Sequence, residues 1–250
     1  MTLDAAFPTA VVLAGGLGTR LREAVADRPK VLAEVCGRPF LFHVLDQLAG
    51  AGARQAVLCV SHQADRVRAA VGDGFKGMAI RYSEEPVPLG TGGALGLALP
   101  LADSETILAV NGDSLFRTDL GRFWAWHLAR DLRSSLLLAQ VDDASRFGRV
   151  ALDQLGRITR FAEKDGVASP GWINAGIYLF HRSRIAGIPA GRPVSLEREL
   201  LPRWLTMGLH GLPAQGLFMD IGTPESYHQA ETALLQERQR RGHDHQPDTL

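Results

Sequence analysis

The sequence predicts an α/β fold with a mostly parallel, mixed sheet flanked by helices. The main observation is an alternation along the chain, in which short apolar runs typical of strands are separated by segments with apolar residues at helical spacing. Such an alternation favours a parallel sheet that is covered on both faces. The second observation is the apolar fraction, 46% of 250 residues, which is ample for one large core or two small ones.

Five apolar runs in the first half predict buried strands, at residues 10–13, 56–60, 80–83, 106–110 and 134–141. The first helix is predicted by apolar residues that recur at helical spacing from Phe40 to Leu48, and Gly50 and Gly52 end it. Three further helices are expected at residues 64–71, 92–99 and 120–130. Pro100 stops the second of these three, because proline cannot continue a helix.

Beyond residue 141 the pattern changes to shorter strands. Residues 149–152 and 158–162 flank a polar turn, which predicts a hairpin. The expected elements that follow are a longer strand at 172–181, a helix at 196–204, a short strand at 217–220 and a last helix from 223 to near 240. Pro224 fits the preference of proline for the first helical turn. We expect residues 1–241 to form a single domain whose halves meet near residue 141, and residues 242–250 to form a disordered tail.

The charge balance restricts the partners. Basic and acidic residues number 27 each, so the net charge is zero, whereas a nucleic-acid or membrane-surface binder would carry a basic excess. Cys36 and Cys59 have no metal-type spacing and suggest no disulfide framework, which favours a reducing compartment. The sequence shows neither a signal-peptide pattern nor an apolar run of membrane-spanning length. The expected location is therefore the cytoplasm, with no nucleic acid and no membrane as partner.

A glycine-rich loop follows the first predicted strand. It reads Gly15-Gly16-Leu17-Gly18-Thr19-Arg20-Leu21, and Lys30 follows ten residues after the arginine. Glycines leave backbone N–H groups unshielded, so such a loop can cradle a phosphate chain, and the two basic side chains would add positive charge. The loop matches neither the Walker A pattern nor the dinucleotide fingerprint. The alternative is an ordinary strand-to-helix turn followed by a solvated lysine.

Three further motifs carry candidate chemistry. The loop from Glu85 to Ala94 is rich in proline and glycine, and could cradle the edge of a base or simply lead into a helix. Asp113 follows a buried strand through Asn111-Gly112, where a carboxylate could hold Mg²⁺ or merely cap a helix. The pair Glu163-Lys164 could bind sugar hydroxyls and a phosphate, or form a solvated charge pair. Asp220 ends the last predicted strand and would complete a metal pair with Asp113.

Taken together, these motifs resemble those of the sugar-1-phosphate nucleotidyltransferases, from residue 11 to residue 233. In family order they are the glycine-rich loop, Pro29-Lys30, residues 88–94, Asn111-Gly112-Asp113, Phe147-Gly148, Glu163-Lys164, Asn174-Ala175-Gly176 and residues 220–225. The resemblance implies a Rossmann-like sheet, with a nucleotide-binding half over residues 1–141 and a smaller, β-rich, sugar-phosphate-binding half over 142–241. It also implies the reaction, in which the phosphate of a sugar 1-phosphate attacks the α-phosphorus of a nucleoside triphosphate and pyrophosphate leaves.

The resemblance assigns roles residue by residue. Catalysis falls to Arg20, Lys30, Asp113 and Lys164, and Mg²⁺ to Asp113 and Asp220. The nucleotide is bound by Leu13, Gly15, Gly16, Gly18, Thr19, Arg20, Glu85, Gly90 and Thr91. The sugar phosphate is bound by Asn111, Gly148, Glu163, Lys164 and Asn174. The nucleophile needs no general base, because a phosphate monoester has a second pKa of about 6 and is largely ionised at neutral pH.

Two details of the sequence narrow the choice of nucleotide and of sugar 1-phosphate. A carboxylate only accepts hydrogen bonds, so Glu85 suits the adjacent N–H donors of guanine better than uracil or thymine, which favours GTP. Residues 22–30 and 37–41 resemble D-glycero-D-manno-heptose 1-phosphate guanylyltransferases, although Val31 stands where relatives usually have a second proline. The expected acceptor is therefore that heptose 1-phosphate. The alternatives are a mannose or hexose 1-phosphate guanylyltransferase, an amino-sugar 1-phosphate uridylyltransferase and a regulatory nucleotide-sugar-binding module. The oligomeric state stays open, a homo-oligomer included.

Overall fold

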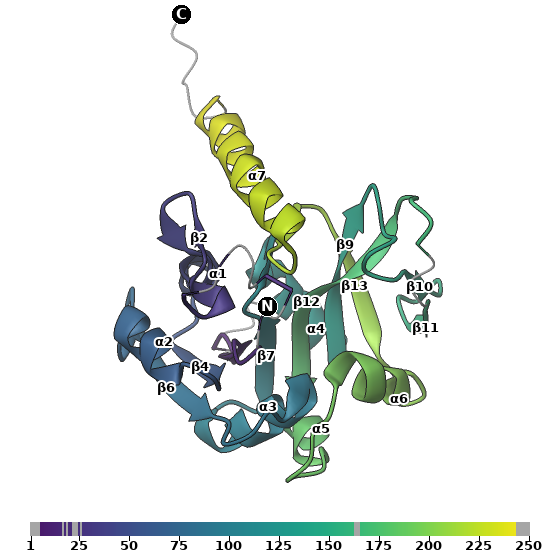
Figure 1. Cartoon of the computed structure of the whole chain (residues 1–250). Coiled ribbons are helices and arrows are strands. Elements are labelled where there is room, and N and C mark those ends of the chain that lie inside the picture. Colours follow the sequence, from purple (N-terminus) through teal and green to yellow (C-terminus); the bar gives the residue numbers. More distant parts are fainter. Residues whose placement is uncertain are drawn as a thin grey trace, which may run out of the picture.

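The computed structural model describes residues 6–16, 18, 20–21, 25, 27–162 and 166–243. Its central sheet contains β1 (Thr9–Leu13), β4 (Gln55–Val60), β5 (Gly74–Phe75), β6 (Met78–Glu84), β7 (Thr106–Asn111), β9 (Ser134–Val141), β12 (Gly171–His181) and β13 (His210–Ala214). The eight strands lie in the order β13-β9-β12-β7-β1-β4-β6-β5 (Figure 1). The predicted α/β class with a mixed sheet is confirmed.

Parallel pairing forms the middle of this sheet. β1 pairs in parallel with both β4 and β7, and β4 pairs in parallel with β6. β12 is antiparallel to both of its neighbours, β7 and β9. Strands from the second half of the chain, β12 and β13, therefore complete a sheet that the first half begins.

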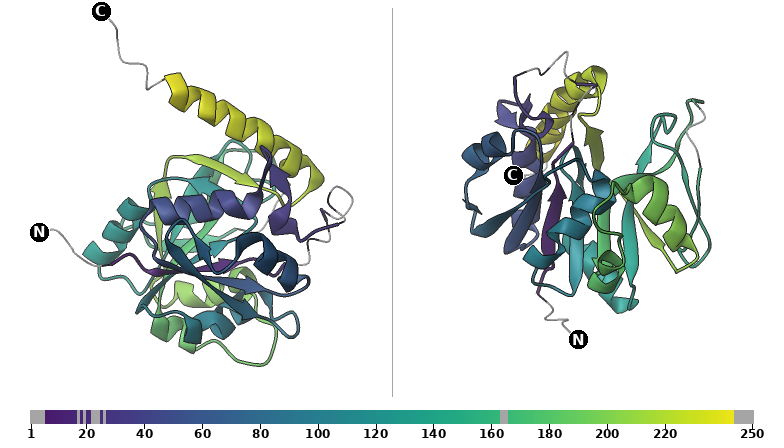
Figure 2. Two further views of the ribbon diagram at one scale, coloured as in Figure 1. Left: turned by 90° about the vertical axis from the view of Figure 1, so that its left-hand side faces the viewer. Right: turned by 60° about the horizontal axis from the view of Figure 1, so that its bottom comes forward.

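Helices cover both faces of the sheet (Figure 2). They are α1 (Phe40–Gly50), α2 (Ala64–Val71), α3 (Gly90–Ala98), α4 (Leu120–Ala129), α5 (Arg182–Ala186), α6 (Leu201–Leu205) and α7 (Pro224–His243). Alternate residues of β1 enter different apolar layers: Ala10 and Val12 pack with Phe40 of α1, whereas Val11 packs with Leu95 of α3. Because β1 is buried on both faces, it appears in the sequence as a continuous apolar run rather than an alternating one.

Three small two-stranded sheets lie beside the central one. The predicted hairpin is present as β10 (Val150–Leu152) and β11 (Ile158–Phe161). β2 (Glu34–Val35) pairs with β3 (Arg38–Pro39), and β8 (Ser114–Arg117) pairs with β14 (Leu217–Asp220). The sequence predicted β14 but not β8, and this pair links the two halves of the chain next to Asp113.

Two helical segments differ from their predictions. The expected helix at 196–204 begins as a π-helix, η3 (Leu196–Leu200), and continues as α6. Pro202 lies in the first turn of α6 and has no N–H to donate, so the change of helix type falls where the regular ladder is interrupted. α7 extends to His243, past its predicted end, and it leads away from the body of the domain in Figure 1. Residues 244–250 lie outside the described part.

None of the helices in the described part of the chain combines the length and hydropathy that crossing a membrane requires.

The start of α3 leads to a stability prediction. Gly90 has φ +70°, and a Cβ there would lie 2.6 Å from the carbonyl oxygen of Val194. That carbonyl also accepts a hydrogen bond from Gly92 N at 2.9 Å, so it cannot easily move away. The close approach that this glycine permits is therefore to protein backbone.

Gly90→Ala is expected to lower the free energy of unfolding by about 2–4 kcal/mol, because it adds a steric clash to a left-handed backbone. Gly191→Ala is the matched control, since Gly191 has φ +75° but nothing within 4 Å of an added Cβ. The control should lose only about 1–2 kcal/mol, from the backbone conformation alone. Urea denaturation measures both, and equal losses would contradict the packing argument.

Candidate active site

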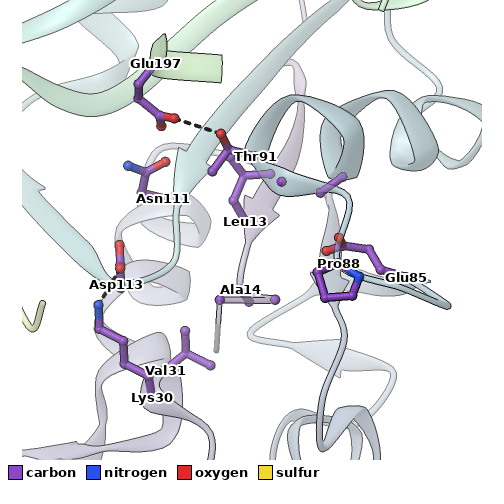
Figure 3. A pocket seen from close by; sticks show the side chains of 14 residues that line it. Leu13, Ala14, Lys30, Val31, Glu85, Pro88, Thr91, Asn111, Asp113 and Glu197 are labelled. Atoms are coloured by element: carbon purple, nitrogen blue, oxygen red, sulfur yellow. Dashed lines mark hydrogen bonds and ion pairs between the residues drawn. The ribbon is translucent and has the colours of Figure 1, made fainter. Parts of the chain in front are cut away.

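A cavity of about 330 Å³ opens at the carboxyl ends of β1 and β7 (Figure 3). It is lined by Leu13, Ala14, Gly15, Gly16, Lys30, Val31, Glu85, Pro88, Gly90, Thr91, Ala94, Asn111, Asp113 and Glu197. Ligands of open α/β sheets bind at the carboxyl ends of strands, where the loops meet. The position of this cavity therefore makes it the candidate active site.

Lys30 and Asp113 form an ion pair in the cavity. Lys30 begins the short 3₁₀ helix η1 (Lys30–Leu32), and its Nζ lies 2.6 Å from Oδ2 of Asp113. The lysine side chain is only 9% exposed, whereas that of the aspartate is 42% exposed. Lys30 is thus no solvated surface lysine. Asp113 does not cap α4 either, because Asp119 is the N-cap of that helix.

The second predicted metal ligand, Asp220, is not among the residues that line the cavity, but strand pairing brings its backbone next to that of Asp113. Antiparallel pairing of β8 with β14 sets Asp220 opposite Ser114, and Ile221 N donates to the backbone oxygen of Asp113 at 3.0 Å. Oδ2 of Asp220 lies 3.5 Å from the guanidinium of Arg146. The two aspartates, far apart in sequence, thus lie on neighbouring backbone segments.

Two carboxylates on neighbouring backbone segments are candidates for holding Mg²⁺, which is usually held by one or two carboxylates together with substrate phosphates and water. Cations already lie against both groups, Lys30 on Asp113 and Arg146 on Asp220, so both positions favour positive charge. Among the described residues no three or more potential ligands gather into a metal centre. A metal held by these two carboxylates would take its remaining ligands from substrate oxygen atoms or from water.

Glu85 is held against the glycine-rich loop. Its Oε2 accepts a hydrogen bond from Leu89 N at 2.8 Å, and its Oε1 lies where a Cβ on Gly15 would be only 2.6 Å away. Ser61 Oγ donates to the carbonyl of Gly15 at 2.6 Å and fixes the other side of the loop. Burial raises the pKa of Glu85. The carboxylate is thus positioned at the cavity wall by contacts that only a glycine at position 15 allows.

Glu197 is a cavity residue that sequence reasoning missed. It lies on η3, and its Oε2 accepts a hydrogen bond from Thr91 Oγ1 at 2.8 Å; Thr91 Oγ1 in turn accepts one from Leu196 N at 2.8 Å. The threonine therefore ties η3 to the first turn of α3. The helical pattern around residue 197 gives no hint of this role, although π-helical turns are frequent at functional sites.

The model of the nucleotidyl transferase family matches residues 9–237. The chain belongs to this family. The prediction made from the motifs is confirmed at that level.

Relatives of this nucleotidyl transferase include sugar-phosphate enzymes. It is 37% identical over 230 residues to a mannose-1-phosphate guanylyltransferase of Mycobacterium tuberculosis, covering 90% of this chain and 64% of that protein. It is 32% identical over 226 residues to a D-glycero-alpha-D-manno-heptose 1-phosphate guanylyltransferase of Aneurinibacillus thermoaerophilus, covering 90% of this chain and 97% of that one. The chain thus spans less than two thirds of the mycobacterial relative and nearly all of the other.

The fold of this nucleotidyl transferase is also that of a solved relative. The crystal structure of HddC from Yersinia pseudotuberculosis complexed with GMP-PN superposes with a TM-score of 0.81 at 30% identity. The match covers 91% of this chain and all of HddC.

The cavity of this nucleotidyl transferase gathers much of the predicted site. Predicted residues that line it are Leu13, Gly15, Gly16, Lys30, Glu85, Gly90, Thr91, Asn111 and Asp113. Gly18 lines a neighbouring recess, and Arg20 is exposed and is not among the described residues of the cavity wall. Thr19, Glu163 and Lys164 lie outside the described residues.

Two predicted sugar-site residues, Asn174 and Gly148, are not among the described residues of the cavity wall. Asn174 Nδ2 donates to the hydroxyl of Tyr178 at 2.9 Å, and Asn111 also hydrogen bonds with this hydroxyl. Burial raises the pKa of Tyr178 well above its usual value, so the hydroxyl stays protonated. Gly148 has φ +78°, and an added Cβ would lie 2.6 Å from the carbonyl of Ala162, directly before Glu163 in the chain.

Proposed function

We propose that the chain is a sugar-1-phosphate guanylyltransferase, which transfers GMP from GTP to a sugar 1-phosphate and releases pyrophosphate. The observation that carries the proposal is a single cavity that holds a half-buried carboxylate, Glu85, at one end and the Lys30–Asp113 pair at the other. Guanine offers adjacent N–H donors to a carboxylate, which only accepts. The names of the mycobacterial and Aneurinibacillus relatives, both guanylyltransferases, support the same base.

The residues of the cavity then act by positioning and by neutralising charge. Lys30, oriented by Asp113, would contact the α-phosphate of the donor, and its ammonium would offset the charge on the reacting phosphate. Asp113 and Asp220 would hold Mg²⁺, which supplies further charge neutralisation on the phosphates. The acceptor phosphate is largely ionised at neutral pH, so no residue is needed as its base.

We further propose that the acceptor is D-glycero-D-manno-heptose 1-phosphate. The residues between Arg20 and Lys30 support this acceptor, as does the match to 97% of the length of the heptose 1-phosphate guanylyltransferase of Aneurinibacillus thermoaerophilus. The second candidate is mannose 1-phosphate, which is favoured by the higher identity of 37% to the mycobacterial relative.

A matrix of nucleotides and sugar 1-phosphates tests both the proposed base and the proposed acceptor. Pyrophosphate release would be measured for GTP, UTP, TTP and ATP against the heptose, mannose, glucose and N-acetylglucosamine 1-phosphates, with Mg²⁺. GTP with the heptose 1-phosphate should give the highest kcat/KM. A preference for mannose 1-phosphate would show that the acceptor is mannose 1-phosphate and not the heptose 1-phosphate. A preference for UTP or TTP would refute the proposal that guanine is the base. Binding of a nucleotide sugar without any turnover would identify a regulatory module instead.

Lys164 is proposed to bind the acceptor phosphate. Lys164→Ala should raise the KM for the sugar 1-phosphate about 10- to 100-fold and leave that for GTP within about two-fold, since a hydrogen bond to a charged group contributes about 1.5–3 kcal/mol. Lys76→Ala is a matched control, because Lys76 lies in the turn between β5 and β6 and its side chain is 61% exposed. A larger effect on the KM for GTP would contradict the assignment.

A further inference from the structure

A second recess, of about 290 Å³, adjoins the cavity. Ala14, Gly16 and Lys30 line both hollows, so the recess begins where the cavity ends at the glycine-rich loop. Its far wall includes His62 and Gln63, which connect β4 to α2. No part of this wall entered the predicted site.

The two hollows differ in charge. The cavity wall carries three carboxylates, those of Glu85, Asp113 and Glu197. The described residues that line the recess include no acidic one but do include Lys30, Arg28 and His62. Asp27 and Glu34 pair with the Arg28 guanidinium, and Asp113 pairs with Lys30, whereas His62 is exposed at the wall of the recess. The recess therefore suits an anion, whereas the cavity suits groups that donate hydrogen bonds or bring a cation.

The loop that contributes His62 and Gln63 to the recess has an energetically unfavourable local conformation. Gln63 has φ 62° and ψ 33°, a left-handed backbone conformation that residues other than glycine rarely adopt. Its Oε1 is buried without a hydrogen-bond partner, while its Nε2 lies 3.2 Å from Nε2 of His62. The preceding residue, Ser61, is hydrogen bonded to Gly15. Local costs of this kind cluster at functional sites, and here the costly loop is tied to the phosphate loop itself.

The strand order indicates on which side of the reacting phosphorus the recess lies. In an in-line displacement the attacking and leaving oxygen atoms lie on opposite sides of the α-phosphorus. The proposed acceptor residues come from β12 and the segments near Gly148, on the β7 side of β1, whereas His62 and Gln63 follow β4, on the other side of β1. The leaving group would thus depart toward the recess.

We infer that His62 and Gln63 bind the β- and γ-phosphates of the donor and the pyrophosphate that leaves. This inference rests on the proposed nucleotidyl transfer. The two side chains touch the leaving group only, so they should matter for a triphosphate or for pyrophosphate and be indifferent to a nucleoside monophosphate.

The test compares ligands with and without the leaving group. His62→Ala and Gln63→Gly should each weaken binding of GTP about ten-fold in calorimetric titration with Mg²⁺, and leave binding of GMP unchanged. Glycine at position 63 keeps the left-handed backbone free of strain. In the reverse reaction, the KM for pyrophosphate should rise about ten-fold while that for the GDP-sugar stays constant.

His228→Ala serves as the control, because His228 is an exposed histidine of α7, and it should change none of these values. An unchanged ratio of GTP to GMP affinity in both variants would overturn the inference, as would an equal loss of both ligands. If the wild-type chain bound neither GTP nor GMP, the proposed function itself would fail, and the inference with it. If it bound both and only the ratio failed to respond, the inference alone would be wrong.

Discussion

Asp113→Asn is expected to lower kcat about 100- to 1,000-fold, the loss typical when one preorganised electrostatic contact is removed from an active site. The carboxylate has two tasks in the proposed mechanism: it would hold Mg²⁺, and it orients the ammonium of Lys30 from 2.6 Å. A neutral amide of the same shape ligates the metal poorly and cannot form the ion pair. Pyrophosphate release at saturating GTP and sugar 1-phosphate measures the change.

The matched control is Asp73→Asn, an exposed aspartate that follows α2. This variant should keep wild-type turnover, and both variants should keep the wild-type circular dichroism spectrum. Asp113→Asn should also need more Mg²⁺ for half-maximal rate. Turnover within a few-fold of wild type at saturating Mg²⁺ would remove Asp113 from the metal site.

Glu85→Gln is expected to change the base preference. The glutamine oxygen can still accept from Leu89 N, as Glu85 Oε2 does at 2.8 Å, which turns the amide NH₂ toward the base. A donor there repels the N–H groups of guanine and matches a carbonyl of uracil or thymine. The kcat/KM for GTP should fall about 10- to 100-fold, from about 1–3 kcal/mol of lost discrimination, while that for UTP or TTP rises.

Glu84→Gln is the neighbouring control, since Glu84 is exposed and pairs with Arg68. It should leave the ratio of GTP to UTP turnover unchanged. A parallel loss with every nucleotide in Glu85→Gln would show a structural role instead of base recognition.

The free energy of unfolding should depend on pH through Glu85, and this dependence can be measured without any substrate. Burial raises the pKa of Glu85, so within the window above its ordinary value of 4.5 the folded chain holds this proton more tightly than the unfolded chain. The contribution of this group to stability therefore falls as the pH rises through that window. Glutamine does not titrate, so Glu85→Gln should gain stability relative to wild type from pH 4 to pH 8 in urea denaturation. A relative loss over that range would contradict the sign.

Local sequence patterns were enough for most of the framework. The helix at 64–71 and the strands at 134–141 and 217–220 have the bounds that the sequence predicted, and the hairpin after residue 149 is present. These elements are encoded by apolar spacing and by turn residues within a few positions of one another. The order of the motifs likewise identified the family, because each motif is short and continuous in the chain.

Other features could not be predicted from local patterns. β13 contains Gly211 and Pro213, which are poor strand formers, and it exists because it pairs in parallel with β9 at the edge of the sheet, where proline is tolerated. The place of Glu197 in the cavity depends on its hydrogen bond to Thr91, more than a hundred residues earlier. The residues around Thr91 do not indicate a contact with Glu197, and those around Glu197 do not indicate one with Thr91.

The sequence by itself determined the alternation of strands and helices, the glycine-rich loop and the family, because these depend on neighbouring residues. Only the tertiary structure decided that Lys30 is buried against Asp113 and that pairing of β8 with β14 brings the backbone of Asp220 next to it. It also decided that the segment before Gln63 is hydrogen bonded to the glycine-rich loop, through Ser61 and Gly15. The physical reason is that these arrangements are set by strand register and by packing between distant segments. A local pattern fixes which face of an element is apolar, and the global packing fixes what that face meets.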